Sequence, residues 1–410
     1  MNSINVIRSS AFYLACLQLV TIAMSIATLP LLSQRLGSQL FGMLFFSITI
    51  SQVFLIITDY GFSISATKNV SQNRCDKKSI TKIWIDVTIA KCILSVTGVL
   101  IIVAISFFVD KFRENLQLIL IGSLSVFGGA LLPLWFFQGI ENLKAISLIQ
   151  LVVKLASYLS LFWVVVDGSD VYKAATLIAS INLLSAILIF PFLLKELCFI
   201  GTATPNIKEV INQFKTGRHV FISVAAISLY SVANAAIIGL FVSYKDLAVF
   251  HIGERIVRGL QSLYSPISNA LFPYVSLLAK QDVNNLKEVN RNIVLLFGSV
   301  FLILGLFIFI MSEQIVIYFF GIEFVASIPI IKIMAFLPFL VVISNTLGFQ
   351  TLLPLGKEIV FSRIMLSAVL ISTLSISLAS MHYGINGAAV VIVLVEIYTI
   401  YVLYYFVKKI

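Results

Sequence analysis

The ionisable side chains with the clearest spacing for chemistry form the run His251-x-x-Glu254-Arg255-x-x-Arg258. Glu254 and Arg258 are four residues apart, so on a helix they share one face and can form an ion pair. Arg255 lies about 100° around that helix from Glu254 and can face a cavity. Two arginines beside one acid leave a net positive charge, and a guanidinium binds phosphate through paired N–H groups. The run therefore predicts an anion site, the alternative being a structural Glu–Arg pair that locks two helices together.

Further charges lie inside apolar stretches, where a charge is costly and becomes a candidate for function. Lys91 and Lys154 are too far from the ends of their stretches for the side chains to extend into water. We expect each of them either to line the same cavity as the arginines or to serve a structural role. Four acids could take up a proton or a sodium ion that drives transport, although local pairing or loop chemistry explains some of them as well: Glu254, Glu396, Asp59 and Asp86.

The motifs of common catalytic and metal sites do not occur in the sequence. We find no GxxxxGK[ST], HExxH or GxSxG, and the four cysteines lack metal-ligand spacing. The net charge of +10 comes from lysines and arginines in short loops rather than from a basic stripe, which argues against nucleic acid as a partner. We therefore expect no cofactor and no metal, and a protein that is not an enzyme.

The elements that must position these residues are long apolar helices. Of the 410 residues, 60% are hydrophobic and 11% are charged, whereas an average soluble domain is about 25% charged. A soluble fold could not hide so much apolar surface from water. Stretches of about 20 apolar residues, the length that crosses a bilayer, occur near 11–32, 39–60, 83–108, 116–137, 143–166, 171–194, 219–241, 247–278, 292–312, 328–350, 359–380 and 386–407.

The longest connection between these spans separates the sixth from the seventh. It contains Gly201, Thr202 and Pro205, which disfavour a helix interior. We therefore predict an N-terminal six-helix bundle over 1–200, a cytoplasmic linker over 201–218 and a C-terminal six-helix bundle over 219–410.

Weak echoes between the two halves indicate an internal repeat. Ser63-x-Ser65 with Val70-Ser71 faces Ser268-x-Ala270 with Val275-Ser276, and Phe137-Gln138 faces Phe349-Gln350. Each half has an even number of spans, so the copies must be parallel, and a substrate site is expected between them. The fold class that follows is all-α integral membrane, with about twelve transmembrane helices in two six-helix bundles around a central cavity.

The distribution of lysine and arginine predicts the orientation. Most of them fall in loops on one side of the predicted membrane, together with both termini. Cytoplasmic loops carry the excess of positive charge, so both termini are predicted to be cytoplasmic. The other side has only Arg35, Lys111, Arg113, Lys173 and Lys245.

Several short segments in both halves resemble the Wzx-type O-antigen flippases of bacteria, within the multidrug/oligosaccharidyl-lipid/polysaccharide exporter superfamily. Their order and spacing carry the resemblance, which extends over essentially the whole chain: Arg35–Gly42, Thr58–Phe62, Ala66–Lys68, Pro133–Glu141 and Ser265–Pro273.

The resemblance implies a V-shaped cavity between two bundles in the bacterial cytoplasmic membrane. It also implies transport of undecaprenyl-pyrophosphate-linked glycan from the inner to the outer face, and it is compatible with contacts to the polymerase and chain-length proteins of the same pathway. The anionic pyrophosphate, or an anionic glycan, would meet cationic residues of the cavity, which this sequence offers as Arg255, Arg258, Lys91 and Lys154. The alternatives are an ion-coupled multidrug exporter of the same superfamily and a membrane glycan polymerase.

Overall fold

The fold is helical throughout the part of the chain that the structure, a computed structural model, describes. It describes residues 3–198, 209–211, 213–214, 221 and 232–409, with side chains from Leu17 onward. The chain divides into two compact units: Met1–Leu31 with Met43–Ser228, and Leu32–Gly42 with Leu229–Ile410. The short segment Leu32–Gly42 thus packs with the second unit, although it lies in the predicted N-terminal bundle. Most of the predicted linker 201–218 lies outside the described residues.

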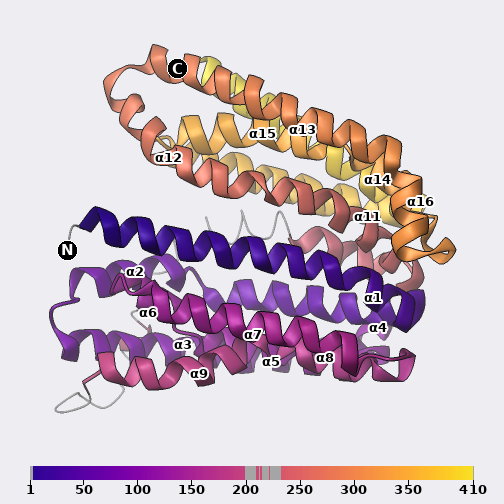
Figure 1. The fold of residues 1–410 in the computed structure, drawn as a ribbon, viewed down its shortest axis with the longest axis horizontal. Helices are drawn as coiled ribbons and strands as arrows, with labels where there is room; N and C mark the ends of the chain where they lie inside the picture. The colour runs from indigo at the N-terminus through magenta and orange to yellow at the C-terminus, as the bar shows by residue number, and fades with distance from the viewer. Residues whose placement is uncertain (1–2, 199–208, 212, 215–220, 222–231, 410) are drawn as a thin grey trace. The chain divides into compact units, whose positions relative to one another are not determined.

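Most of α1 belongs to the first unit, and the helices that follow it along the chain, from α2 to α9, complete this unit (Figure 1). Tyr60 and Gly61, both with positive φ, separate α1 from the short helix α2. The bounds are α1 Ser3–Asp59, α2 Phe62–Gln72, α3 Lys77–Ser106, α4 Asp110–Glu114, α5 Leu116–Leu131, α6 Leu134–Gly139, α7 Leu143–Val164, η1 Gly168–Asp170, α8 Val171–Ala179 and α9 Ile181–Glu196.

The second unit contains longer helices and one π-helical turn. Its first described helical segment after the gap is Val232–Phe241. The bounds of the others are α11 Tyr244–Ser262, α12 Tyr264–Gln281, α13 Val283–Phe320, η2 Ile322–Phe324, α14 Ser327–Met334, α15 Leu337–Leu347, the π-helix η3 Gly348–Leu352 and α16 Glu358–Lys408.

These helices confirm an all-α membrane protein of about twelve spans. Within the described ranges, eight helices are long and apolar enough to cross a membrane. The two longest, α1 and α16, are interrupted by the non-helical residues Gly37 and Gly384, so each accounts for two of the predicted spans. Helices α11 and α12 together fill the predicted span 247–278. Of the predicted span 219–241, residues 219–220 and 222–231 lie outside the described part.

Several predicted spans are broken rather than continuous helices. The span 116–137 is divided at Leu132–Pro133, between α5 and α6. Proline lacks the N–H that an uninterrupted helix needs and restricts the residue before it, which explains the break. The spans 171–194 and 328–350 are likewise divided, at Ser180 and near Ala335. Such breaks leave backbone groups and polar side chains within the span, which a cavity can use.

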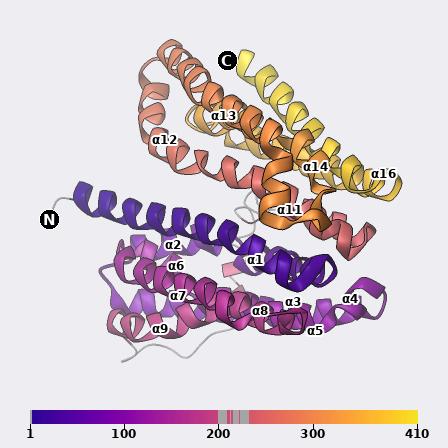
Figure 2. The same ribbon diagram turned by 45° about the vertical axis from the view of Figure 1, so that its right-hand side comes forward.

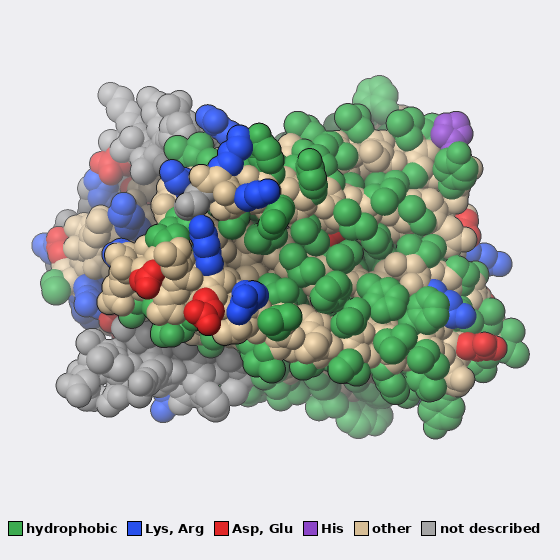
Figure 3. Space-filling view, turned by 90° about the horizontal axis from the view of Figure 1, so that it is seen from above, with side chains coloured by type: hydrophobic (Ala, Val, Ile, Leu, Met, Phe, Trp, Pro, Cys, Tyr) green, Lys and Arg blue, Asp and Glu red, His purple; other side chains and the backbone are tan. Residues whose placement is uncertain are grey.

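The surface matches what a membrane protein requires. One face of the molecule shows a broad band of hydrophobic side chains, with lysines and arginines gathered towards one side of it (Figure 3). Large apolar side chains such as Phe107, Phe108 and Tyr318 are more than three-quarters exposed. In water such a surface would be an aggregation hazard, whereas lipid tails are a favourable solvent for it.

Segments that echo one another in sequence occupy comparable places in their own units. In the first unit α2 lies beside α6 in both views (Figures 1 and 2), and Thr67 Oγ1 donates to the Trp135 carbonyl at 3.0 Å. In the second unit α12 packs on η3, and Gln350 Nε2 donates to the Ser268 carbonyl at 2.7 Å. Val70 and its counterpart Val275 are both fully buried. These pairings support a duplicated unit.

Gly37 and Gly42 each meet a different backbone requirement at the interruption of α1. Gly37 has φ 71°, a left-handed conformation that strains other residues. Gly42 lies against the second unit's own helix α11, so that a Cβ there would be 1.9 Å from the carbonyl oxygen of Tyr244. The two glycines of the segment Arg35–Gly42 are thus explained by the positive φ at Gly37 and by the close approach of the Tyr244 backbone at Gly42.

We expect Gly42→Ala to destabilise the protein by about 1–3 kcal/mol, because backbone must move to admit the methyl group. Thermal unfolding of the purified protein in detergent measures the effect. Gly298→Ala is the matched control, since its Cβ would lie 3.4 Å from the Phe339 ring, an ordinary contact distance. Equal melting temperatures for the two variants would contradict the close approach at Gly42.

Candidate functional site

The run His251–Arg258, predicted to form an anion site, lies on α11, and the expected ion pair between Glu254 and Arg258 is present. Arg258 Nε lies 2.7 Å from Glu254 Oε1, and the Glu254 side chain is 7% exposed. Arg255 makes no ion pair with any described residue. Because Glu254 neutralises one guanidinium, the charge of Arg255 remains available to a ligand.

Both arginines line a pocket of about 390 Å³ that lies within the second unit. Its wall combines them with hydroxyl and amide groups from α11, α12 and α15, among them Gln261, Tyr264, Asn269 and Asn345. A volume of several hundred Å³ is typical of small-molecule sites. The pocket therefore offers a net positive charge surrounded by neutral hydrogen-bonding groups.

A buried hydrogen-bond network holds the wall of this arginine pocket. Gln350, fully buried on the π-helix, donates to the hydroxyl of Ser268 at 2.9 Å, and Ser268 donates to Asn345 Oδ1 at 2.7 Å. From α13, Asn290 Nδ2 donates to the Gln350 carbonyl at 3.2 Å and to Thr351 Oγ1 at 2.9 Å. Ser268 and Asn345 both line the pocket, so the network fixes α12 and α15 against each other at the site.

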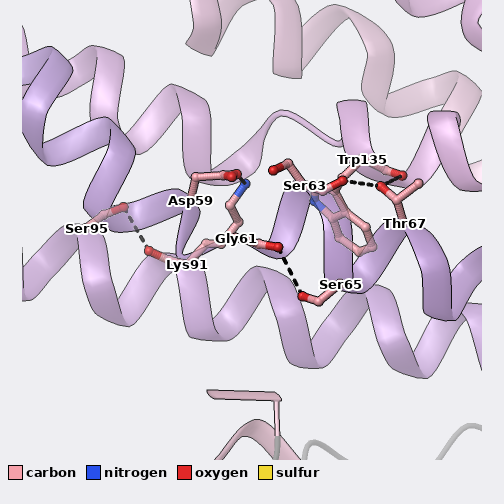
Figure 4. A network of polar contacts seen from close by, with 8 residues as sticks. All are labelled: Asp59, Gly61, Ser63, Ser65, Thr67, Lys91, Ser95 and Trp135. Atoms are coloured by element: carbon pink, nitrogen blue, oxygen red, sulfur yellow. Dashed lines mark hydrogen bonds and ion pairs between the residues drawn. The ribbon is translucent and has the colours of Figure 1, made fainter. Parts of the chain in front are cut away.

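Lys91, predicted to line the arginine cavity or to be structural, forms an ion pair within the first unit. Its Nζ lies 3.0 Å from Oδ1 of Asp59, the last residue of α1 (Figure 4). The Lys91 side chain is 5% exposed and that of Asp59 is 31% exposed. The two predicted residues are thus brought together, and the pair ties the end of α1 to α3. Its geometry favours the structural alternative for Lys91.

Lys154 lines a second polar pocket, of about 180 Å³, within the first unit. It projects from the middle of α7, and its Nζ donates to Thr21 Oγ1 at 3.1 Å. The other polar groups of the wall are hydroxyls and amides, including Ser51, Gln52 and Asn182. Lys154 and the two arginines therefore line different pockets, each formed by residues of one unit.

The other two predicted ion-coupling acids are both buried. Glu396 on α16 is 5% exposed and accepts a hydrogen bond from the hydroxyl of Ser344. Asp86 on α3 is 2% exposed, and its Oδ1 has no hydrogen-bond partner among the described residues. Neither acid lines the arginine pocket or the Lys154 pocket.

Sequence reasoning missed several residues that form the arginine pocket. Asn345 is the clearest example, because it projects from an apolar span without a charge to mark it. Polar amides inside an apolar span are themselves a signal, since each must find a partner away from lipid. Asn345 and Gln350, five residues apart in one apolar stretch, carried that signal.

The fold is that of known transporters. The structure superposes on the inward closed conformation of the lipid II flippase MurJ with a TM-score of 0.74, at 12% identity over 97% of this chain and 87% of that one. An inward-facing multidrug resistance MATE family transporter of the MOP superfamily gives a TM-score of 0.72, at 14% identity over 96% and 94%. With its apolar helices, the chain is thus a multi-pass membrane protein with a transporter fold.

Residues 7–279 match the family described as polysaccharide biosynthesis protein, and the chain belongs to this family. It is also similar to the "Putative O-antigen transporter" of Escherichia coli (strain K12), at 27% identity over 95% of this chain and 94% of the relative. A protein of the same description from Shigella dysenteriae is 26% identical over 83% of this chain and 85% of the relative.

Proposed function

We propose that the protein is a flippase that moves undecaprenyl-pyrophosphate-linked oligosaccharide, such as O-antigen repeat units, from the cytoplasmic to the periplasmic face of the bacterial inner membrane. The observation that carries the proposal is the pocket formed by Arg255 and Arg258. A pyrophosphate carries adjacent negative charges, and guanidinium groups bind phosphate oxygens through paired N–H donors. The family described as polysaccharide biosynthesis protein and the O-antigen transporter relatives support a glycan as the group attached to this pyrophosphate.

In this mechanism the arginine pocket holds the pyrophosphate while the prenyl tail stays in lipid. Glu254 keeps Arg258 oriented through their 2.7 Å pair, and Arg255 supplies the charge that the pair leaves over. The sugars occupy a polar lumen that opens alternately to the two sides, as in other transporters built from repeated units. Both termini lie in the cytoplasm, in line with the concentration of lysine and arginine on that side.

Deletion of the gene in its native host tests the proposal. We expect complete lipid-linked repeat units to accumulate on the inner face of the cytoplasmic membrane, with surface polysaccharide lost and both restored by the wild-type gene. Single repeat units stranded on the outer face would instead indicate a polymerase. Normal surface polysaccharide would contradict the flippase and lead to assays of drug efflux.

Among the four acids, Glu396 is the best placed to couple transport to an ion. It is buried at membrane depth, and the Ser344 hydroxyl that it binds belongs to the helix that also supplies Asn345 to the arginine pocket. Glu254 and Asp59 form the ion pairs with Arg258 and Lys91 described above. Asp86 remains a second candidate because of its burial.

We expect Glu396→Gln to abolish stimulation of transport by an imposed proton or sodium gradient and to leave substrate binding unchanged. The neutral amide keeps the size of the side chain but cannot carry the charge that an ion must balance. Transport into proteoliposomes with and without each gradient measures the effect, with Glu358→Gln, on the exposed first turn of α16, as control. Gradient-driven transport that persists in Glu396→Gln would exclude this residue.

A further inference from the structure

The positive charge of Lys154 is not balanced by any acid in the described part of the chain. Its only hydrogen bond among these residues goes to the hydroxyl of Thr21, and no carboxylate lines its pocket. Lys91, which also lies within an apolar span of the same unit, forms an ion pair in which its Nζ is 3.0 Å from Oδ1 of Asp59. On the second unit Arg258 is paired with Glu254. Lys154 therefore lacks the acidic partner that Lys91 and Arg258 have.

A lysine at the middle of a membrane-spanning helix requires a partner for its charge. Nζ carries three donors, and Thr21 accepts from one of them. An uncompensated ammonium group at this depth is costly, whereas an anion that enters the pocket would remove much of that cost. The first requirement on a ligand is thus a negative charge.

The hydroxyl groups of the wall set a second requirement. Ser47, Ser51 and Ser125 each donate their hydroxyl hydrogen to a backbone carbonyl, at 2.8, 2.8 and 2.7 Å respectively. Their oxygens keep free lone pairs and can therefore accept hydrogen bonds from a ligand but not donate to it. A matching ligand must bring O–H or N–H donors, which a halide ion lacks.

The size of the pocket sets a third requirement. Its volume of about 180 Å³ corresponds to about six water molecules at about 30 Å³ each. Sites for complete small-molecule ligands are larger, about 300–1,000 Å³. The pocket thus fits one hydroxylated ring of a larger ligand.

We propose that the Lys154 pocket is a subsite for an acidic sugar of the glycan, with Lys154 binding its carboxylate and the serine oxygens accepting from its hydroxyl groups. The inference rests on the flippase function and adds to it the chemical class of one sugar in the repeat unit. The pyrophosphate and the acidic sugar are bound by different pockets in different units. Loss of one contact therefore leaves the other measurable.

The test uses lipid-linked repeat units extracted from a host strain that lacks this gene. Half of the material is carboxyl-reduced, which converts each carboxylate to a primary alcohol and leaves the rest of the sugar unchanged. Binding of both forms is measured with the purified full-length protein in nanodiscs. We expect the wild type to bind the native form about tenfold more tightly, the value of one charge-assisted contact.

Two variants and one control connect this preference to Lys154. Lys154→Gln should bind both forms alike, and Lys154→Arg should keep most of the preference because it keeps the charge. Lys332→Gln is the control, since Lys332 is an exposed lysine of another apolar span whose Nζ lies 5.8 Å from the centre of the Phe309 ring. If Lys154→Gln does not fold, the difference in wild-type affinity between the native and the carboxyl-reduced form still tests the proposal, because that comparison needs no variant.

Each contrary outcome has a distinct meaning. A repeat unit without acidic sugar, or equal wild-type affinity for the two forms, overturns the subsite. A loss of affinity for undecaprenyl pyrophosphate without glycan in Lys154→Gln would overturn it in favour of a pyrophosphate contact. Transport that depends on chloride in the wild type but not in Lys154→Gln would overturn it in favour of a free anion. If the wild type binds neither the native nor the carboxyl-reduced lipid-linked repeat unit, the flippase proposal itself fails, and the subsite proposal fails with it.

Discussion

Arg255→Gln is expected to lower the affinity for an isoprenyl pyrophosphate by about 10- to 100-fold, because hydrogen bonds to charged groups contribute about 1.5–3 kcal/mol. Arg255 lines the arginine pocket and forms no ion pair with a described residue, so its removal leaves no buried acid behind. Folding should therefore change little. Binding of farnesyl pyrophosphate, a soluble isoprenyl pyrophosphate without a glycan, measures the effect on the purified protein.

The matched variants separate charge from geometry at this position. Arg255→Lys should recover part of the affinity, since lysine keeps the charge but not the planar pair of donors. Arg291→Gln removes an exposed arginine outside the pocket and should leave binding unchanged. An Arg255→Gln protein that binds the probe as the wild type does would contradict the assignment of the arginine pocket to pyrophosphate.

Lys91→Met is expected to destabilise the protein by about 2 kcal/mol or more, because it leaves Asp59 without the ammonium group 3.0 Å away. The figure is below the full cost of breaking a buried pair, since the Asp59 side chain is 31% exposed. We expect the melting temperature in detergent to fall on the order of 5 °C.

Removal of both charges tests whether the unpaired acid causes the loss. The double variant Lys91→Met/Asp59→Asn should recover most of the stability, because the desolvation cost of both ions disappears with their attraction. Arg113→Met, which breaks an exposed pair with Asp110, should change stability by less than about 1 kcal/mol. A double variant as unstable as Lys91→Met would show that the lysine stem, and not the charge, holds α3.

The helices and their approximate limits followed from apolar length alone. Lipid offers no hydrogen bonds to the backbone, and a helix satisfies its N–H and C=O groups internally. A run of about 20 apolar residues therefore indicates a membrane-spanning helix. The predicted span 143–166 corresponds closely to α7, Leu143–Val164. Where proline interrupts the backbone, as at Pro133, the span is divided, a feature that length does not reveal.

Pairing of the charged residues depended on whether the partners are close in sequence. Glu254 and Arg258 could be paired in advance because the helical repeat fixes their separation. The partner of Lys91 is 32 positions away on another helix, and only the packing of α1 against α3 brings Asp59 to it. For the same reason the sequence could not show that Lys154 lines a pocket formed by its own unit, and the two arginines a pocket formed by theirs.

Translocation by the purified protein tests the central claim most directly. Lipid-linked repeat units are placed in proteoliposomes, and an external glycosidase or lectin reports how much glycan is accessible outside over time. We predict that the accessible fraction rises from about half to nearly all of the glycan with wild-type protein and rises far more slowly with Arg255→Gln or in protein-free vesicles. A wild-type protein that leaves the glycan on its original leaflet, under every ion gradient tested, would contradict the proposed function.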